Sequence, residues 1–449
     1  MRALLIIFLN VFVLSQPIPG FTFDLKSDSS DSISSLLTLE EAIRTALANN
    51  PDLAAAKWDA VAAQARRNQA AGERLPRLSM VDGYAHHVDV QRLLPVRQPG
   101  DPSILSRDIV SGDLVISLPL FTGGRLVNQV RAAELLRQAA EHRLAHTSKE
   151  LVFNVSSVFF SILAQRHVIE SLEFSQHTLE EHLKRVEALV EAQKAARVDL
   201  MRTEVRLADV SQRLVQERNV AAIQRRALAN LLGMTEHDRQ LSLQGDLESE
   251  EKVMIPDSET ALEMALAARD DYLSARSALE AQSRNVDVAK AGHWPTIALQ
   301  GAYGARWAAG PKSGSGKSLD DIGRVGLAIE LPLFEGGKVD ARVQEESADY
   351  SAALERLRKI ELQVRYEVEA AQLNISSARE RSAAIQKAID QAGESLRIEQ
   401  QKYELGKGAI VDVLDAQAAL LESQTNYFRV LAELHTAKAQ FRLATGEER

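Results

Sequence analysis

The chain has 449 residues, a formal net charge of -9 and no cysteine. This length exceeds the usual size of a single core, so we expect either two domains or one elongated, repetitive body. Acidic and basic residues interleave along the chain without forming a basic stripe, which argues against nucleic acid as a partner. The lack of cysteine excludes disulfides, thiolate metal sites, cysteine nucleophiles and a lipid anchor on an N-terminal cysteine.

The N-terminus has the pattern of an export signal. An apolar run from Leu4 to Leu14 follows Arg2 and is too short to span a bilayer. We therefore predict a signal peptide over residues 1–23, cleaved within Ser15–Phe23. The alternative is a buried N-terminal helix.

The rest of the chain consists of two copies of one unit. Tyr84 recurs as Tyr303 (303 − 84 = 219), whereas the motif Leu-Pro-Leu-Phe-x-Gly-Gly at 118–124 recurs at 331–337 (331 − 118 = 213). The first copy therefore has six additional residues (219 − 213 = 6), which we place in a surface loop where prolines cluster. The predicted repeats cover residues 38–233 and 258–446.

Each copy contains two segments in which apolar and polar residues alternate. The clearest are 297–307 and 325–333, and the first copy repeats the pattern at 114–120 and less cleanly at 78–84. Hairpins of strands about 10 residues long suit a transmembrane barrel, although a half-buried soluble hairpin fits the alternation equally well. Four strands cannot close a barrel alone, so strands in a membrane require the chain to oligomerise.

Long helices connect these hairpins to sharp turns. Residues 125–195 lack proline and glycine and carry apolar residues at helical spacing, which corresponds to a helix of about 100 Å. Heptad stripes follow over 200–228 and 413–441, and they predict coiled-coil packing. We place the turns near 195–198 and 407–411, and expect a mainly α fold with a small β part.

The chain resembles the TolC-like outer-membrane efflux proteins over residues 38–446. The resemblance rests on the start Thr38-Leu39-Glu40-Glu41-Ala42 leading to Asn49-Asn50-Pro51, on the two motifs that join strand to helix, and on residues 403–416. The junction residues are Pro119, Gly123, Gly124, Pro332, Gly336 and Gly337.

The resemblance implies an outer-membrane channel that extends into the periplasm and serves a tripartite efflux or type I secretion system. It implies a homotrimer in which four strands per chain form one β-barrel in the outer-membrane lipid, and long helical hairpins form an α-barrel. It also implies docking on a periplasmic adaptor protein and an inner-membrane efflux pump or ABC transporter. The alternatives are a periplasmic adaptor and a structural coiled-coil protein, neither of which accounts for the duplicated strands.

The resemblance further implies a pore constriction at the second turn. The acidic positions are Asp412 and Asp415, and threefold symmetry turns each into a ring that attracts cations. The alternative for Asp412 is a helix cap, as for Asp199 in the other copy. Tyr403 matches a latch tyrosine, but Gly408 stands where a basic latch residue is expected.

Three other signals carry little weight. Residues 309–318 resemble a phosphate-binding loop but lack its first glycine and precede a strand. His142 and His146 have a metal-ligand spacing without a third ligand, so we read them as a polar helix face and expect no metal site. Neither a catalytic motif nor a cofactor motif stands out, and we expect no enzyme activity.

Overall fold

The computed structural model describes residues 37–93, 105–234, 242–248, 255–308 and 320–447, all within one compact unit, Leu36–Arg449. The predicted signal peptide, the proline-rich loop of the first copy around 95–102, and the segment 309–318 lie outside the described residues.

Both copies have the same order of elements. The first contains α2 (Leu39–Asn49), α3 (Pro51–Gly72), β1 (Arg77–Arg92), β2 (Leu105–Phe121), α4 (Arg125–Glu191) and α5 (Arg197–Leu231). The second contains α6 (Ser258–Ala268), α7 (Asp270–Lys290), the short 3-10 helix η2 (Ala291–His293), β3 (Thr296–Ala308), β4 (Asp320–Glu330), α8 (Lys338–Glu404) and α9 (Ile410–Thr445). The predicted duplication and mainly α fold are confirmed.

Polar residues define the first helix starts. At α2, the backbone N–H of Glu41 donates to the Thr38 hydroxyl at 3.4 Å, and the Thr38 N–H donates to the Glu41 carboxylate at 2.9 Å. At α3, the Asn50 side-chain oxygen accepts from the N–H groups of Asp52 and Leu53 at 2.9 and 3.1 Å. These bonds satisfy N–H groups that have no partner in the first helical turn.

The four strands form one antiparallel sheet in the order β1-β2-β3-β4. Pairing places Leu114 beside both Met80 and Tyr303, and successive side chains alternate between the faces, so most apolar residues share one face. The opposite face carries Ser111, Asp113, Gln300, Arg306, Arg324 and Glu330.

The first hairpin is longer than predicted. β1 and β2 have 16 and 17 residues, whereas β3 and β4 have 13 and 11, nearer the expected length of about 10. In β1, Asp82 and His86 interrupt the apolar face, yet backbone pairing with β2 continues past them. Pairing therefore extends beyond the segment whose side chains alternate.

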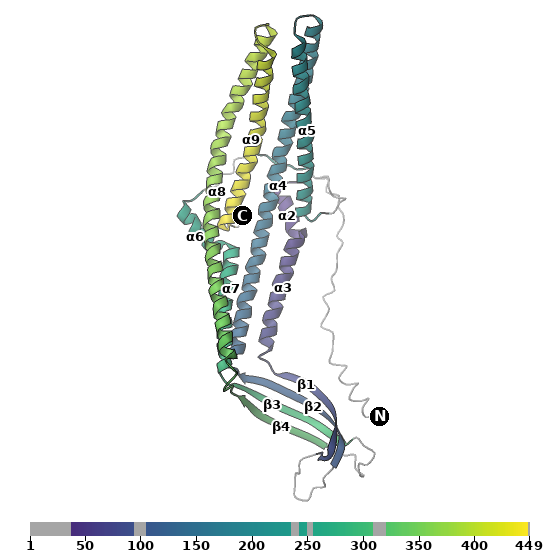
Figure 1. Ribbon diagram of the computed structural model, residues 1–449, viewed down its shortest axis with the longest axis vertical. Helices are drawn as coiled ribbons and strands as arrows, with labels where there is room; N and C mark the ends of the chain where they lie inside the picture. The colour runs from purple at the N-terminus through teal and green to yellow at the C-terminus, as the bar shows by residue number, and fades with distance from the viewer. Residues whose placement is uncertain (1–36, 94–104, 235–241, 249–254, 309–319, 448–449) are drawn as a thin grey trace. The chain divides into compact units, whose positions relative to one another are not determined.

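The long helices lead away from the sheet. α4 and α8 have 67 residues each, or about 100 Å, and begin just after β2 and β4. At their far ends α5 and α9 fold back, forming two helical hairpins (Figure 1). Within the described ranges, α4 alone passes a length-and-hydropathy test for a membrane span, but its apolar residues include the core side chains described next.

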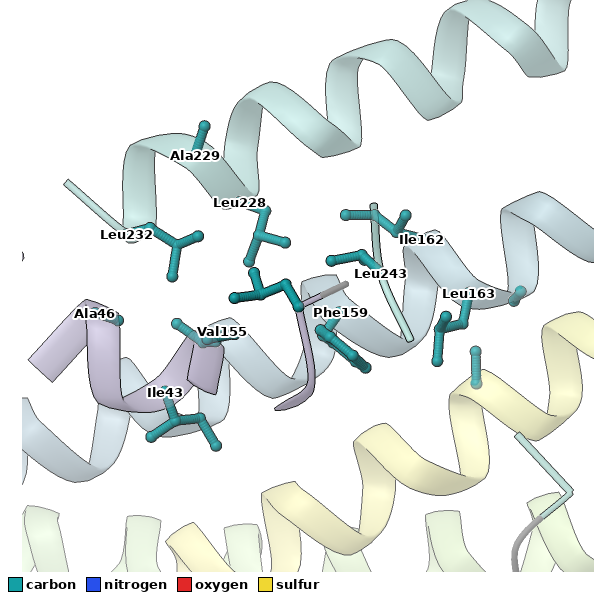
Figure 2. Close-up of a cluster of buried hydrophobic side chains, with 14 of the residues drawn as sticks. Ile43, Ala46, Val155, Phe159, Ile162, Leu163, Leu228, Ala229, Leu232 and Leu243 are labelled. Carbon is teal, nitrogen blue, oxygen red and sulfur yellow. The ribbon is translucent and has the colours of Figure 1, made fainter. Parts of the chain in front are cut away.

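The core consists of three separate clusters. The first, drawn in Figure 2, joins α2, α4, α5 and the segment after α5 through Ile43, Ala46, Val155, Phe159, Leu228, Leu232 and Leu243. The second joins the two hairpins near their turns and includes Leu179, Val186 and Val413. The third joins α6, α8 and α9 and includes Ala265, Val368 and Phe441. The heptad residues Leu228, Val413 and Phe441 are therefore buried in these clusters.

Candidate gate at the helical tips

The two turns at the ends of the helical hairpins, called the tips here, share one backbone geometry. In the turn between α4 and α5, Gln193 has φ of 57°, and the next residue donates its N–H to the Leu189 carbonyl at 2.8 Å. Gly406 occupies the equivalent position between α8 and α9, with φ of 67°, and the next residue, Lys407, donates its N–H to the Lys402 carbonyl at 2.9 Å. Positive φ favours glycine, so the second tip adopts this turn with less strain.

Both predicted constriction acids lie on the exposed side of α9. Asp412 and Asp415 are exposed, whereas Val413 and Leu414 between them are buried in the cluster that joins the hairpins. Residues three apart on a helix are neighbours on its surface. The two carboxylates therefore share one solvent-facing surface, and packing of Val413 and Leu414 fixes the rotation of the helix.

The capping alternative for Asp412 and Asp199 is wrong. The N-cap residues are Ala409 for α9 and Ala196 for α5, and neither helix has a side-chain capping bond. Each helix begins earlier than capping would require, so both aspartates lie within the first turn. A negative charge there is still favoured by the helix dipole.

Tyr403, the candidate latch residue, lies near the end of α8 and is half-buried against the cluster that joins the hairpins. Its ring centroid lies 5.8 Å from that of His182 in α4. Burial raises the pKa of Tyr403, and the negative charge of Asp199 raises it further. Tyr403 and Asp199 are therefore brought together, as members of opposite hairpins.

A cleft of about 650 Å³ separates the two tips. Asp199, Tyr403 and Gly408 line it, whereas Asp412 and Asp415 do not. Across it, the Arg185 guanidinium of α4 lies 3.2 Å from the Glu404 carboxylate of α8. The candidate site therefore has two parts, a joint between the hairpins and an acidic surface beside it.

Sequence reasoning missed His182, Arg185 and Glu404. The sequence does hold a signal for the first, because His182 lies three residues after Leu179 and four before Val186, both buried. A polar residue within an apolar stripe points to an internal contact. The pair of Arg185 and Glu404 is 219 residues apart, and no local pattern indicates it.

Gly408 is closely packed in this turn, so a side chain there requires its neighbours to shift. A Cβ atom there would lie 3.0 Å from Lys402 Cβ and 3.1 Å from the Tyr403 nitrogen. The neighbouring residue Lys407 is basic and exposed. The latch expected from the resemblance therefore has its tyrosine but not its basic residue.

The paired glycines of the junction motifs turn the chain from strand to helix. Gly123 and Gly124 lie between β2 and α4 with φ of 61° and 87°, and Gly336 and Gly337 precede α8 with φ of 64° and 80°. Pro119 still pairs with β3, immediately before a register shift, whereas Pro332 lies beyond the end of β4.

Comparison with known proteins gives a consistent result. The family model "Outer membrane efflux protein" matches residues 42–234 and 261–447. The chain is 24% identical over 412 residues to the outer membrane protein TolC of Vibrio cholerae, covering 91% of this chain and 90% of that one. It is 26% identical over 437 residues to the pyoverdine export outer membrane protein OpmQ of Pseudomonas putida, covering 91% and 86%.

Comparison with solved structures indicates the same family fold. The outer membrane protein VceC of Vibrio cholerae superposes with a TM-score of 0.77 at 20% identity, covering 91% of this chain and 96% of that one. Both copies of the unit match the family model, and the sheet and helical hairpins are those of the fold. The chain therefore belongs to the outer membrane efflux protein family, as a TolC-like channel of the outer membrane and not an enzyme.

Proposed function

We propose that the chain is one subunit of a homotrimeric, passive conduit in a tripartite efflux or type I secretion system, gated at its periplasmic tips. The observation that carries the gate is the exposed pair Asp412 and Asp415, held on one surface of α9 by the buried residues between them. In a threefold assembly each aspartate forms a ring, and rings of carboxylates attract and bind cations.

The unpaired edge strands of the sheet support the proposed homotrimer. β1 and β4 are the edge strands of the described sheet, and edges exposed in lipid cost several kcal/mol for each unpaired backbone group. Pairing β4 of one chain with β1 of the next removes them.

The helices offer matching surfaces. α5 and α8 lie at opposite sides of the helical layer, because α4 contacts α5 and α9 contacts α8 (Figure 1). Both carry exposed apolar side chains: Met201, Val205, Val215 and Ile223 on α5, and Leu354, Leu362, Tyr366 and Leu373 on α8. At 1.5 Å per residue, the α8 stripe lies in the half of that helix nearer the sheet, level with α3, whereas the α5 stripe lies nearer the tips. Placing α8 of one chain beside α3 and α5 of the next therefore covers the α8 stripe with α3, where Trp58 and Val61 are exposed, and closes the helical wall.

The same arrangement supports the proposed partners. The sheet presents its apolar face to the outer-membrane lipid, with Val325 78% and Leu327 62% exposed in the single chain. The tips then face the inner membrane, so a periplasmic adaptor docks there and connects the channel to an efflux pump or ABC transporter.

Single-channel recording in planar bilayers tests the gate. We expect the double variant Asp412→Asn and Asp415→Asn to conduct more, or to be blocked less by divalent cations, than the unmodified protein. The matched control is Glu187→Gln with Glu204→Gln, which removes two exposed carboxylates from α4 and α5. An unchanged conductance and an unchanged block would remove the acidic-ring proposal.

A further inference from the structure

The joint between the hairpins contains two buried polar atoms without a hydrogen-bond partner among the described residues. They are Nε2 of His182 and the hydroxyl of Tyr403, on opposite hairpins, and the two rings are tilted by 53° to each other. Burying a polar atom without a partner costs free energy. Separation of the hairpins would let water reach both atoms, so this contact opposes the closed arrangement that the surrounding apolar residues favour.

The surroundings of His182 disfavour a positive charge. Leu179 and Val186 on the same helix are buried on either side of it. Arg185, one turn on, carries a positive charge of its own and forms the pair with Glu404. His182 forms no ion pair of its own within the described part of the chain.

Every element around the cleft contributes side chains. The titratable groups are Glu181 and Arg185 of α4, Lys194 of the first turn, Asp199 of α5, and Tyr403 and Glu404 of α8, while α9 contributes the uncharged Val413 and Gln417. Burial lowers the pKa of His182, Arg185 lowers it further, and Glu404 offsets part of this effect.

We propose that His182 is a pH-responsive residue of the gate, whose neutral imidazole allows the hairpins to pack together and whose protonated form separates them at the Tyr403 contact. This inference rests on the proposed gate at the tips. It adds a second control, distinct from the acidic surface of α9.

The direction of the pH effect on the gate follows from the direction in which the pKa of His182 changes. Above the ordinary histidine pKa of about 6.5, the imidazole is neutral in both the closed and the open state, so the pH does not change their populations. Below that pH the open state, in which water solvates the imidazolium, takes up a proton first and gains population. The effect levels off once the pH is below the lowered pKa of the closed state.

A distance measurement tests this proposal. The chain has no cysteine, so Glu191→Cys and Lys407→Cys introduce two unique labelling sites, one in each tip, at exposed residues. Pulsed electron paramagnetic resonance on the purified oligomer, diluted with unlabelled chains, reports the distance between the tips within one chain. We expect a longer distance, and a several-fold larger open fraction, at about pH 5 than at about pH 8.

Variants separate His182 from other groups. His182→Gln removes the proton site and is expected to keep the short distance at both pH values, whereas His182→Arg is expected to give the long distance at both. The control His177→Gln, at an exposed histidine of the same helix, keeps the full response. A pH response that persists in His182→Gln, or a distance that does not change with pH in the labelled parent, overturns the proposal.

The two proposals fail separately. The distance measurement does not depend on conduction. If the distance changes with pH but the Asp412→Asn and Asp415→Asn variant conducts like the unmodified protein, the acidic-ring proposal is wrong and the His182 proposal stands. If the distance does not change with pH but the double variant alters the conductance or the block by divalent cations, the acidic-ring proposal stands and the His182 proposal is wrong.

Discussion

The guanidinium of Arg269, at the corner between α6 and α7, donates a hydrogen bond of 2.6 Å to the Glu367 carboxylate of α8. It also donates two bonds to Asp271, at 2.9 and 2.7 Å, and its side chain is only 6% exposed. The equivalent residue of the first copy is Asn50, which caps α3 instead (269 − 50 = 219). The second copy thus replaces a helix cap with a buried charge network that connects α7 to α8.

Replacing Arg269 should destabilise the protein strongly. Arg269→Met leaves the Asp271 and Glu367 carboxylates without their cation, and breaking a buried pair costs about 3–5 kcal/mol. We expect a lower melting temperature of the detergent-solubilised protein, followed by circular dichroism. The control is Arg276→Met, whose side chain is 60% exposed beside Glu280, and which should cost at most about 1 kcal/mol. Equal losses in the two variants would contradict this account.

The same network should make stability depend on pH. Burial alone raises the pKa of Asp271, but hydrogen bonds and charge from Arg269 lower it below its ordinary value overall. A carboxyl group with a lowered pKa stabilises the folded protein above its ordinary pKa of about 4, and this contribution is lost as the pH falls through the lowered value. We expect the difference in melting temperature between the parent and Asp271→Asn to shrink below about pH 4. A difference that stays constant would show that the carboxylate charge does not matter.

The two glycine junctions should differ in tolerance. Gly123 and Gly336 have φ of 61° and 64°, so alanine is strained at both. A Cβ at Gly123 would lie 2.5 Å from Trp294 Cβ, whereas no described atom lies within 4 Å at Gly336. We therefore expect Gly123→Ala to reduce the amount of heat-stable oligomer in outer-membrane fractions more than Gly336→Ala. Similar losses would mean that backbone strain alone sets the cost.

Much of this fold can be predicted from sequence because each feature repeats or is local. The duplication and the long helices follow from periodic apolar residues, the second turn follows from the glycines that interrupt them, and the first turn follows from its correspondence to the second. The end of the first hairpin is harder to predict, because backbone pairing continues past Asp82 and His86, which interrupt the apolar alternation.

The joint between the tips is even harder to predict from the sequence. Arg185 and Glu404 meet only because α4 packs against α9, and α9 in turn against α8. The heptad pattern predicts that helices pack, but it does not specify which hairpins are neighbours. The rotation of α9 can be predicted from the sequence, because the buried Val413 and Leu414 lie beside Asp412 and determine which way its carboxylate faces.

Restoring a basic residue at Gly408 should open the gate instead of latching it. The Cβ of Gly408→Arg would lie 3.0 Å from Lys402 Cβ and 3.1 Å from the Tyr403 nitrogen, so these neighbours must shift by a few tenths of an ångström and disturb the contact between Tyr403 and His182. We expect a higher single-channel conductance, and Gly408→Ala should change it in the same direction because the clash begins at Cβ. Lys407→Ala, at an exposed residue of the same turn, should have little effect. If Gly408→Arg lowered the conductance while Gly408→Ala raised it, the added guanidinium would be forming a latch despite the close packing, and the steric argument would be wrong.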